Sequence, residues 1–177
     1  MNRIDRLFKS KKSGMLSVYM TAGYPGLHDT VEVIRELAKN GVDMIEIGMP
    51  FSDPLADGPL LQVCNQQALK NGMTLNLLFE QLGYIRESVD IPLLLMGYLN
   101  PVLNFGVEKF CKKARYVGMD GVILPDLPVR EYILHYRNHF RENDLHMIFL
   151  ISPQTAEDRI REIDSAVSGF IYMVSSA

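Results

Sequence analysis

Six short apolar segments are the feature that most constrains the fold of this chain. They span residues 15–21, 42–48, 91–98, 120–126, 146–152 and 169–175. Most are too short for buried helices, and they carry apolar side chains at both odd and even positions. Strands covered by helices on both faces have this pattern, because neither face of such a parallel sheet meets water. The segments therefore predict six parallel β-strands.

Amphipathic helical patterns separate these segments. A short first helix is indicated by Ile4, Leu7 and Phe8, which fall at helical spacing. Longer patterns follow at residues 29–42, 74–89, 107–119, 130–144 and 155–167. Strands start at roughly 25-residue intervals, apart from a longer insertion after the second strand. This alternation of strand and helix predicts a parallel α/β fold.

Two α/β architectures compete for this pattern. A doubly wound sheet usually has a glycine-rich first βα turn, and G-x-G-x-x-G is absent. A (β/α)8 TIM barrel places polar, functional residues just after its strands, at one end of the barrel, and this chain repeatedly has polar residues there. We therefore predict a TIM barrel with only its first six strands present. A closed barrel needs two more strands, so we expect residues 1–177 to form a single (β/α) barrel domain that is incomplete at its C-terminal side.

Composition and charge exclude several classes of function. The 47% hydrophobic and 22% charged residues are typical of a globular protein, and the formal charge of −3 provides no basic surface for nucleic acid. No apolar run has transmembrane length, and the N-terminal segment has no secretory h-region. Cys64 and Cys111 form neither a metal-spaced nor a redox pair. We expect a cytoplasmic protein that binds neither nucleic acid nor membranes.

Glu46 is the first candidate for catalysis. It lies in the stretch "IEIGMPFSDPLADGP", inside the second apolar strand, where both faces are expected to be buried. Burial disfavours the charged carboxylate and raises the pKa, which suits a group that must both give and take a proton near neutral pH. The alternative is a structural role, in which the carboxylate pairs with a buried cation.

Asp57 and Asp53 lie in the loop that ends this stretch. Asp57 could cap a helix, but Pro59 is favoured at the first helical position, which makes Gly58 the N-cap and leaves Asp57 outside. Asp57 and Glu46 would then resemble an acid/base pair whose environments differ. Asp53 precedes a proline, a common turn element, and an exposed loop acid of this kind is either solvated or part of a protein contact.

Three tyrosines lie near the ends of predicted strands. Tyr19, Tyr98 and Tyr172 could simply keep their hydroxyls in water. Together with Leu95 and Ile123 they could instead line a flat aromatic pocket at one end of the barrel. The sequence leaves both readings open.

Two further polar features are expected to have structural rather than catalytic roles. Asp126 stands between Pro125 and Leu127 and is expected to anchor a loop. His135 and His139 have the spacing of a metal-binding pair, but no third ligand is evident, so a solvated helix face is expected.

The full string from Ile45 to Pro59 resembles the tryptophan synthase α subunit family, indole-3-glycerol-phosphate lyases of the (β/α)8 class. The segments "YMTAGYPG", "LLLMGYLNPVLNFG", "GVILPDLP" and "FIYMVS" extend the resemblance over the whole chain. It implies a carbon–carbon lyase of tryptophan biosynthesis. Such an enzyme cleaves indole-3-glycerol phosphate by a reverse aldol reaction and passes the indole to a β subunit, in an α2β2 heterotetramer.

The resemblance also implies roles for single residues. Glu46 becomes the proton donor and acceptor, and Asp57 holds the indole N–H. The residues implied to surround or position the substrate are Tyr19, Leu95, Ile123 and Tyr172. The residues implied to face the β subunit are Pro50, Asp53, Pro54, Asn100, Asn104 and Pro128. No metal or organic cofactor is implied for this chain, and pyridoxal phosphate is expected only in the β subunit.

Members of this family continue beyond the sixth strand, into segments that the present sequence does not include. Family members go on to a mobile loop with a catalytically important threonine, and to two strands whose glycine-rich turns bind the phosphate. Two alternatives to the partnered lyase therefore stay open. One is a stand-alone lyase that releases indole, and the other is a catalytically weak barrel fragment that binds a partner.

Overall fold

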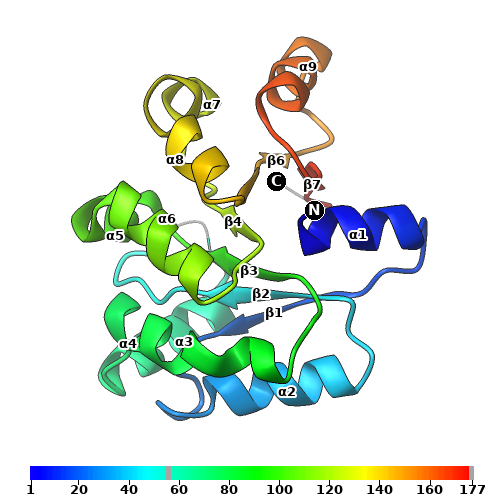
Figure 1. Cartoon of the computed structure of the whole chain (residues 1–177). Coiled ribbons are helices and arrows are strands. Elements are labelled where there is room, and N and C mark those ends of the chain that lie inside the picture. Colours follow the sequence, from blue (N-terminus) through cyan, green and yellow to red (C-terminus); the bar gives the residue numbers. More distant parts are fainter. Residues whose placement is uncertain (55–56, 176–177) are drawn as a thin grey trace.

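The predicted parallel strands are present and follow one another side by side in sequence order. The computed structural model describes residues 1–54 and 57–175. Its main sheet has five parallel strands in the order β1-β2-β3-β4-β5, and a second parallel pair joins β6 to β7 (Figure 1). The strands are β1 (Ser17–Thr21), β2 (Met44–Gly48), β3 (Leu93–Met96), β4 (Gly121–Ile123), β5 (His146–Ile148), β6 (Leu150–Ile151) and β7 (Tyr172–Met173).

The fifth predicted strand is divided into two parts at Phe149. Residues 146–148 pair with β4, and residues 150–151 pair with β7. Phe149, between the two parts, is buried and packs edge-on against Tyr132 at 5.6 Å between ring centroids. The sheet order therefore continues through this break to the sixth predicted strand. The result is a (β/α)8 barrel arrangement with its first six strands.

Helices lie around the outside of these strands, except for the first helix, which packs on their inner side (Figure 1). They are α1 (Arg3–Ser10), α2 (Thr30–Lys39), α3 (Pro59–Lys70), α4 (Leu75–Gln81), α5 (Leu99–Phe105), α6 (Val107–Tyr116), α7 (Val129–Glu131), α8 (Arg137–Glu142) and α9 (Glu157–Ala166), with a 3-10 segment η1 (Leu82–Glu87) and a π-helical segment η2 (Tyr132–Tyr136). The predicted helices are all present, but 74–89 and 130–144 are interrupted by η1 and η2. The start of α3 at Pro59 was predicted but its extent was not, and α5 was not predicted. Both begin near a proline, Pro59 and Pro101, which a first helical turn accepts.

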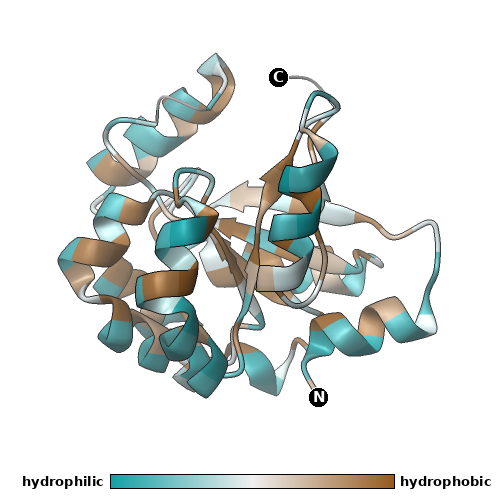
Figure 2. Cartoon of the chain, turned by 90° about the horizontal axis from the view of Figure 1, so that it is seen from above, coloured by the Kyte–Doolittle hydropathy of each residue, from teal (hydrophilic) through white to brown (hydrophobic). Residues whose placement is uncertain are grey.

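The two faces of each strand belong to two different hydrophobic cores. The core between strands and helices contains Ile45, Ile47 and Leu95. The core inside the barrel contains Met44 and Leu94, alternating with the first set. The remaining buried members of the inner core are Ile4, Ile123 and Ile148. Figure 2 shows the strands as hydrophobic, with hydrophilic residues along the outer sides of the helices.

The first helix closes the barrel interior beside β7 (Figure 1). Ile4 of α1 is fully buried in the inner core, and Phe8 stacks on Phe170 at 5.2 Å between ring centroids. The helix starts at Asn2, whose side chain accepts a hydrogen bond from the Ile4 N–H at 2.9 Å. Its amide also donates to the Asp120 carbonyl at 2.8 Å, so the helix cap is tied to the loop before β4.

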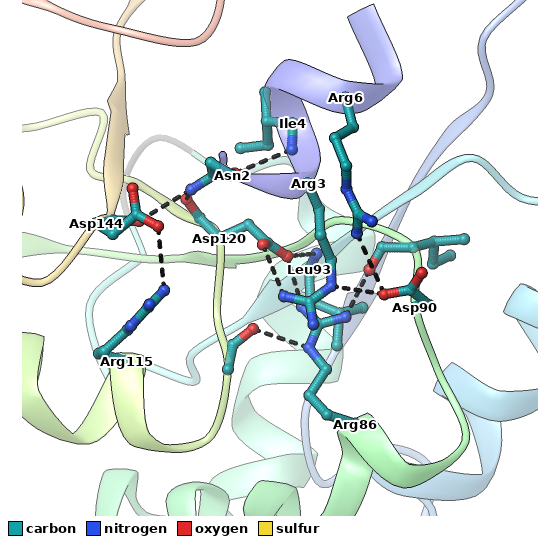
Figure 3. A network of polar contacts seen from close by, with 12 residues as sticks. Asn2, Arg3, Ile4, Arg6, Arg86, Asp90, Leu93, Arg115, Asp120 and Asp144 are labelled. Atoms are coloured by element: carbon teal, nitrogen blue, oxygen red, sulfur yellow. Dashed lines mark hydrogen bonds and ion pairs between the residues drawn. The ribbon is translucent and has the colours of Figure 1, made fainter. Parts of the chain in front are cut away.

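A buried ionic network lies at the N-terminal ends of β3 and β4 (Figure 3). The Asp120 side chain is 3% exposed and is paired with Arg86 and, at 3.2 Å, with Arg3. It also accepts a hydrogen bond from the Leu93 N–H at 3.0 Å. Burial lowers the pKa of Arg86 to about 10, although the Asp120 charge acts against this. One carboxylate thus joins α1, η1 and the start of β3.

Candidate active site

Glu46 lies in the middle of β2 and faces the barrel interior. It shares this face with Met44, and its side chain is buried, with 3% exposed. Burial raises the pKa of the Glu46 carboxyl, and a hydrogen bond from Ser17 acts in the opposite direction. The Ser17 hydroxyl donates to Glu46 Oε1 at 2.6 Å. The structural alternative of a buried cation is not observed among the described partners of Glu46.

A pocket of about 300 Å³ opens beside Glu46. Tyr172 lies on its wall, and burial followed by the nearby Glu46 charge raises the pKa of the tyrosine hydroxyl. The side chains around the pocket are Phe8, Met15, Leu16, Ser17, Met44, Glu46, Phe170, Ile171, Tyr172 and Met173. The lining comes from α1, the starts of β1 and β2, and β7, so the pocket lies between the two edge strands of the incomplete barrel.

Asp57 precedes α3 and does not cap it. The helix begins at Pro59 with Gly58 as N-cap, as predicted. The Asp57 carboxylate instead accepts a hydrogen bond at 3.0 Å from Asn65, a buried residue of α3, and a second one from Tyr98. Burial raises the pKa of Asp57, and these two hydrogen bonds reduce the effect. The second carboxyl is thus held by side chains rather than by the helix end.

Tyr19 connects the surroundings of the two carboxyls. It is the register partner of Glu46 across the β1–β2 ladder. Its hydroxyl lies against Gly48, so a side chain at position 48 would collide with it. Burial raises the pKa of Tyr19, and the nearby Asp57 charge adds to the rise. The predicted tyrosines therefore lie on both sides of Glu46, with Tyr19 on β1 and Tyr172 on β7.

The expectation for Leu95 is wrong. Leu95 points away from the barrel interior and is fully buried against the helices. Its neighbour Met96 has the opposite parity, pairs with Ile123 across the ladder, and packs on the inner core. Ile123 itself faces the interior. Because a shift of one residue moves a side chain to the other face of a strand, Met96 occupies the place expected for Leu95.

The residues expected to face a partner differ in their exposure. Asp53, Asn100 and Asn104 are exposed, and the two asparagines lie on the helix α5 rather than in a loop. Pro128 is also exposed, as the N-cap of α7. Pro54 is buried, so it supports the loop from within and does not present a surface.

The segments that carry these residues follow the ends of three neighbouring strands, β2, β3 and β4. Pro50, which follows β2, is half-buried. The Leu99 N–H, at the start of α5, donates to both Asp126 oxygens at 2.9 and 3.1 Å. The prediction of a loop-anchoring role for Asp126 is therefore confirmed, and this anchor positions α5 near the end of β4.

Several residues of the site escaped the sequence reasoning. Ser17 could have been noticed only weakly in the sequence, as a polar residue on the same strand face as Tyr19 in an otherwise apolar segment. Met96 carried none, because Leu95 and Met96 are both apolar. Asn65 was missed because only the start of its helix, at Pro59, was predicted.

The described part of the chain has neither a metal-binding cluster nor a membrane-spanning helix. Within residues 1–54 and 57–175, no group of three or more histidine, cysteine, aspartate or glutamate side chains is placed to hold a metal ion. Among the same residues, no helix is long and apolar enough to cross a membrane.

Fold and site together define a (β/α) barrel enzyme with a buried carboxyl inside the barrel and a second carboxyl after the second strand. The family model described as "Tryptophan synthase alpha chain" matches residues 6–177. The chain belongs to this family, which consists of lyases, and its role is in tryptophan biosynthesis.

Individual relatives agree with this assignment. The tryptophan synthase alpha chain of Flavobacterium psychrophilum is 58% identical over all 177 residues, which cover 70% of that protein. Tryptophan synthase subunit alpha from Legionella pneumophila is 37% identical, with a TM-score of 0.93 over 99% of this chain and 68% of that one. A tryptophan synthase complex from Pyrococcus furiosus matches with 37% identity and a TM-score of 0.85, over 92% of this chain and 67% of that one.

Proposed function

We propose that this chain is a carbon–carbon lyase that cleaves indole-3-glycerol phosphate into indole and glyceraldehyde 3-phosphate by a reverse aldol reaction. The observation that carries the proposal is the burial of Glu46, 3% exposed, beside a pocket between β1, β2 and β7. Burial raises the pKa of this carboxyl toward the range in which it can act both as acid and as base. Family membership supplies the substrate class.

In the proposed reaction Glu46 serves two proton transfers in sequence. The protonated carboxyl gives its proton to carbon 3 of the indole ring. The carboxylate then removes the proton from the glyceryl hydroxyl, whose oxygen becomes the carbonyl of glyceraldehyde 3-phosphate. The bond between carbon 3 and the glyceryl carbon breaks, and its electron pair returns to the ring. Glu46 ends in its starting protonation state, so one carboxyl is sufficient.

Asp57 offsets the positive charge that forms on the ring nitrogen when carbon 3 is protonated. We place it there because a carboxylate held by Asn65 and Tyr98 needs little rearrangement to stabilise that charge. Tyr19, Ile123 and Tyr172 line the substrate site, and we add Met96 because it faces the barrel interior. The reaction consists of proton transfers, so we propose that the chain needs no metal or organic cofactor.

We further propose that a tryptophan synthase β subunit carrying pyridoxal phosphate receives the indole, in an α2β2 assembly. Asp53, Asn100, Asn104 and Pro128 support this, because they are exposed on segments that follow adjacent strand ends. The Pyrococcus furiosus neighbour is a tryptophan synthase complex. We also propose that residues 1–177 form one barrel domain, since both cores draw on the same strands.

The test is indole release from indole-3-glycerol phosphate, measured with and without a β subunit. We expect Glu46→Gln to lose at least about a hundredfold in rate, because general acid–base catalysis contributes that much. Glu36→Gln, an exposed change on α2, is the control and should keep its rate. Normal turnover by Glu46→Gln would exclude the acid/base role. Equal release with and without the partner would indicate a stand-alone lyase, and binding without release would indicate a partner-binding barrel.

A further inference from the structure

We propose that Ser17 is a positioning residue for Glu46, whose hydroxyl holds one carboxylate oxygen in place while the carboxyl faces the pocket. The inference rests on the proposed function for Glu46. Ser17 does not need to touch the substrate for this role. It acts through the acid that does.

The geometry of the contact is that of a strong hydrogen bond. Ser17 Oγ lies 2.6 Å from Glu46 Oε1, within the range of hydroxyl-to-carboxylate bonds. Both side chains line the same pocket. Among the residues that the structure describes, Ser17 is the one that donates a hydrogen bond to this carboxyl. The orientation of the acid therefore depends on a single hydroxyl.

The strand register delivers Ser17 to Glu46. Ser17 pairs with Met44, and Tyr19 pairs with Glu46, so Ser17 and Glu46 are diagonal neighbours on the inner face of adjacent parallel strands. The register is fixed one residue before each strand. The Leu16 N–H donates to an Asp43 side-chain oxygen at 2.8 Å, and the Asp43 N–H donates to the Leu16 carbonyl at 2.9 Å.

Lys11 holds Asp43 in this arrangement. Its Nζ lies 2.8 and 2.7 Å from the two Asp43 oxygens. The Lys11 bond, followed by the Leu16 N–H, lowers the pKa of Asp43, so the carboxylate stays charged over the neutral range. Ser17 is thus the first residue of β1 after an anchored turn, and its side chain has a fixed starting point.

The hydroxyl also opposes the effect of burial on Glu46. A donor to the charged form of an acid stabilises that form, and the Ser17 bond lowers the pKa of Glu46 against the rise caused by burial. The titratable groups facing Glu46 from neighbouring strands are Tyr19 on β1 and Tyr172 on β7. Neither is charged near neutral pH. Ser17 therefore sets how readily Glu46 alternates between its two protonation states.

The experiment is a carbon-13 NMR titration of the Glu46 carboxyl in the complete chain. Glu46 is assigned by the loss of its signal in Glu46→Gln. We expect Ser17→Ala to raise the pKa of Glu46 by about one unit. Losing a hydrogen bond to a charged group changes the ionisation free energy by an amount that corresponds to about one pKa unit. Ser17→Thr, which keeps the hydroxyl, should stay within a few tenths of a unit of the unsubstituted chain. Ser165→Ala on the exposed side of α9 is the control and should cause no shift.

A purely structural role for Ser17 would give a different result. In that case Ser17→Ala would lower the melting temperature and leave the Glu46 titration unchanged, which would overturn the inference. Equal shifts in Ser17→Ala and Ser17→Thr would overturn it as well. If Ser17→Ala does not fold, Ser17→Cys replaces it, because a thiol fills the space and donates weakly. The pKa of Glu46 should then rise, and an unchanged titration in Ser17→Cys would count against the inference.

The pH profile of indole release separates this inference from the proposed function. Where the chain releases indole, the limb of kcat/KM due to Glu46 should move to higher pH in Ser17→Ala by the same shift. Indole release without any Glu46 shift rejects the Ser17 inference alone. A Glu46 shift in a chain that releases no indole rejects the proposed reaction and leaves the Ser17–Glu46 coupling established.

Discussion

At the scale of single residues, Glu46 is placed where its ionisation is costly. The side chain is buried among apolar residues of the barrel interior, and the pKa of its carboxyl is raised. A solvated glutamate would be easier to fold and less useful as an acid near neutral pH. The same burial therefore supports the proposed chemistry and lowers the stability of the fold. This conflict can be measured.

We expect Glu46→Gln to be more stable than the unsubstituted chain near pH 7, while it loses activity. A carboxyl whose pKa is higher in the folded state favours folding fully below its unfolded pKa, and that contribution disappears as pH rises through the folded pKa. Glutamine does not titrate, so its advantage should grow with rising pH and vanish near pH 4. Each unit of pKa difference is worth about 1.4 kcal/mol.

The measurement is thermal unfolding of Glu46→Gln and of the unsubstituted chain at pH 4 to 8. Glu36→Gln is the matched control, since the Glu36 side chain is 53% exposed and pairs with Lys39 at the surface. Its unfolding free energy should change by less than about 0.5 kcal/mol at each pH. A stability difference between Glu46→Gln and the parent chain that does not change with pH would contradict the explanation based on desolvation.

At the scale of strands and helices, the sequence predicted the elements better than it predicted which side chains meet. Glu46 was identified because a charged residue inside an apolar strand is conspicuous. The prediction that Leu95 lines the site, in place of its neighbour Met96, was wrong. In a strand that is apolar on both faces, the sequence does not show which side chains point inward. Ser17 could be recognised as part of the site only once the β1–β2 register was known.

The extent of α3 and the presence of α5 escaped prediction for a related reason. The segments Pro59–Lys70 and Leu99–Phe105 follow strand ends and contain proline near their starts, and no amphipathic helical pattern was recognised beyond the predicted start at Pro59. Proline fits the first turn of a helix because the N–H groups there have no partner within the helix. The consequence concerned function as well, since Asn65, Asn100 and Asn104 all lie on these helices.

The closeness of α1 to β4 gives a prediction at this scale. A Cβ added to Gly121 would lie 3.0 Å from the His146 carbonyl oxygen and 3.1 Å from Ile4 Cδ1. Gly121→Ala should therefore lose about 1–3 kcal/mol of unfolding free energy, because the His146 backbone of β5 and the Ile4 side chain of α1 must both give way. Urea unfolding measures the difference.

Gly83→Ala is the matched control for this change. Gly83 lies in η1, and an added Cβ there would meet nothing within 4 Å. Alanine in such a place should stabilise the fold by up to about 1 kcal/mol, because it restricts the unfolded chain. Equal effects of the two substitutions would show that β5 and α1 do not pack as closely around Gly121 as described.

At the scale of the whole molecule, Asp120 joins parts of the chain that are far apart in sequence. It connects Arg3, Arg86 and Leu93, and its own backbone carbonyl accepts a hydrogen bond from Asn2 (Figure 3). The N-terminal helix is therefore held by buried polar contacts as well as by Ile4 and Phe8. These contacts lie at the N-terminal ends of β3 and β4.

We expect Asp120→Asn to destabilise the whole molecule by about 3 kcal/mol or more, because it leaves Arg86 partly buried without its anion. Asp90→Asn is the control, since the Asp90 side chain is 78% exposed although it also pairs with Arg3. That change should cost less than about 1 kcal/mol. Denaturant unfolding of both variants compares them, and similar losses would mean that burial of the network contributes little.

The alternation of strand faces has a consequence for engineering this chain. Inward positions such as Met44, Glu46 and Met96 and outward positions such as Ile47 and Leu95 are interleaved on the same strands, yet they contact separate sets of side chains. A combinatorial library confined to the inward set would change the shape of the cavity and leave the contacts with the outer helices as they are. Selection for a new substrate and selection for thermal tolerance could then proceed in parallel, at different residue positions of the same strands.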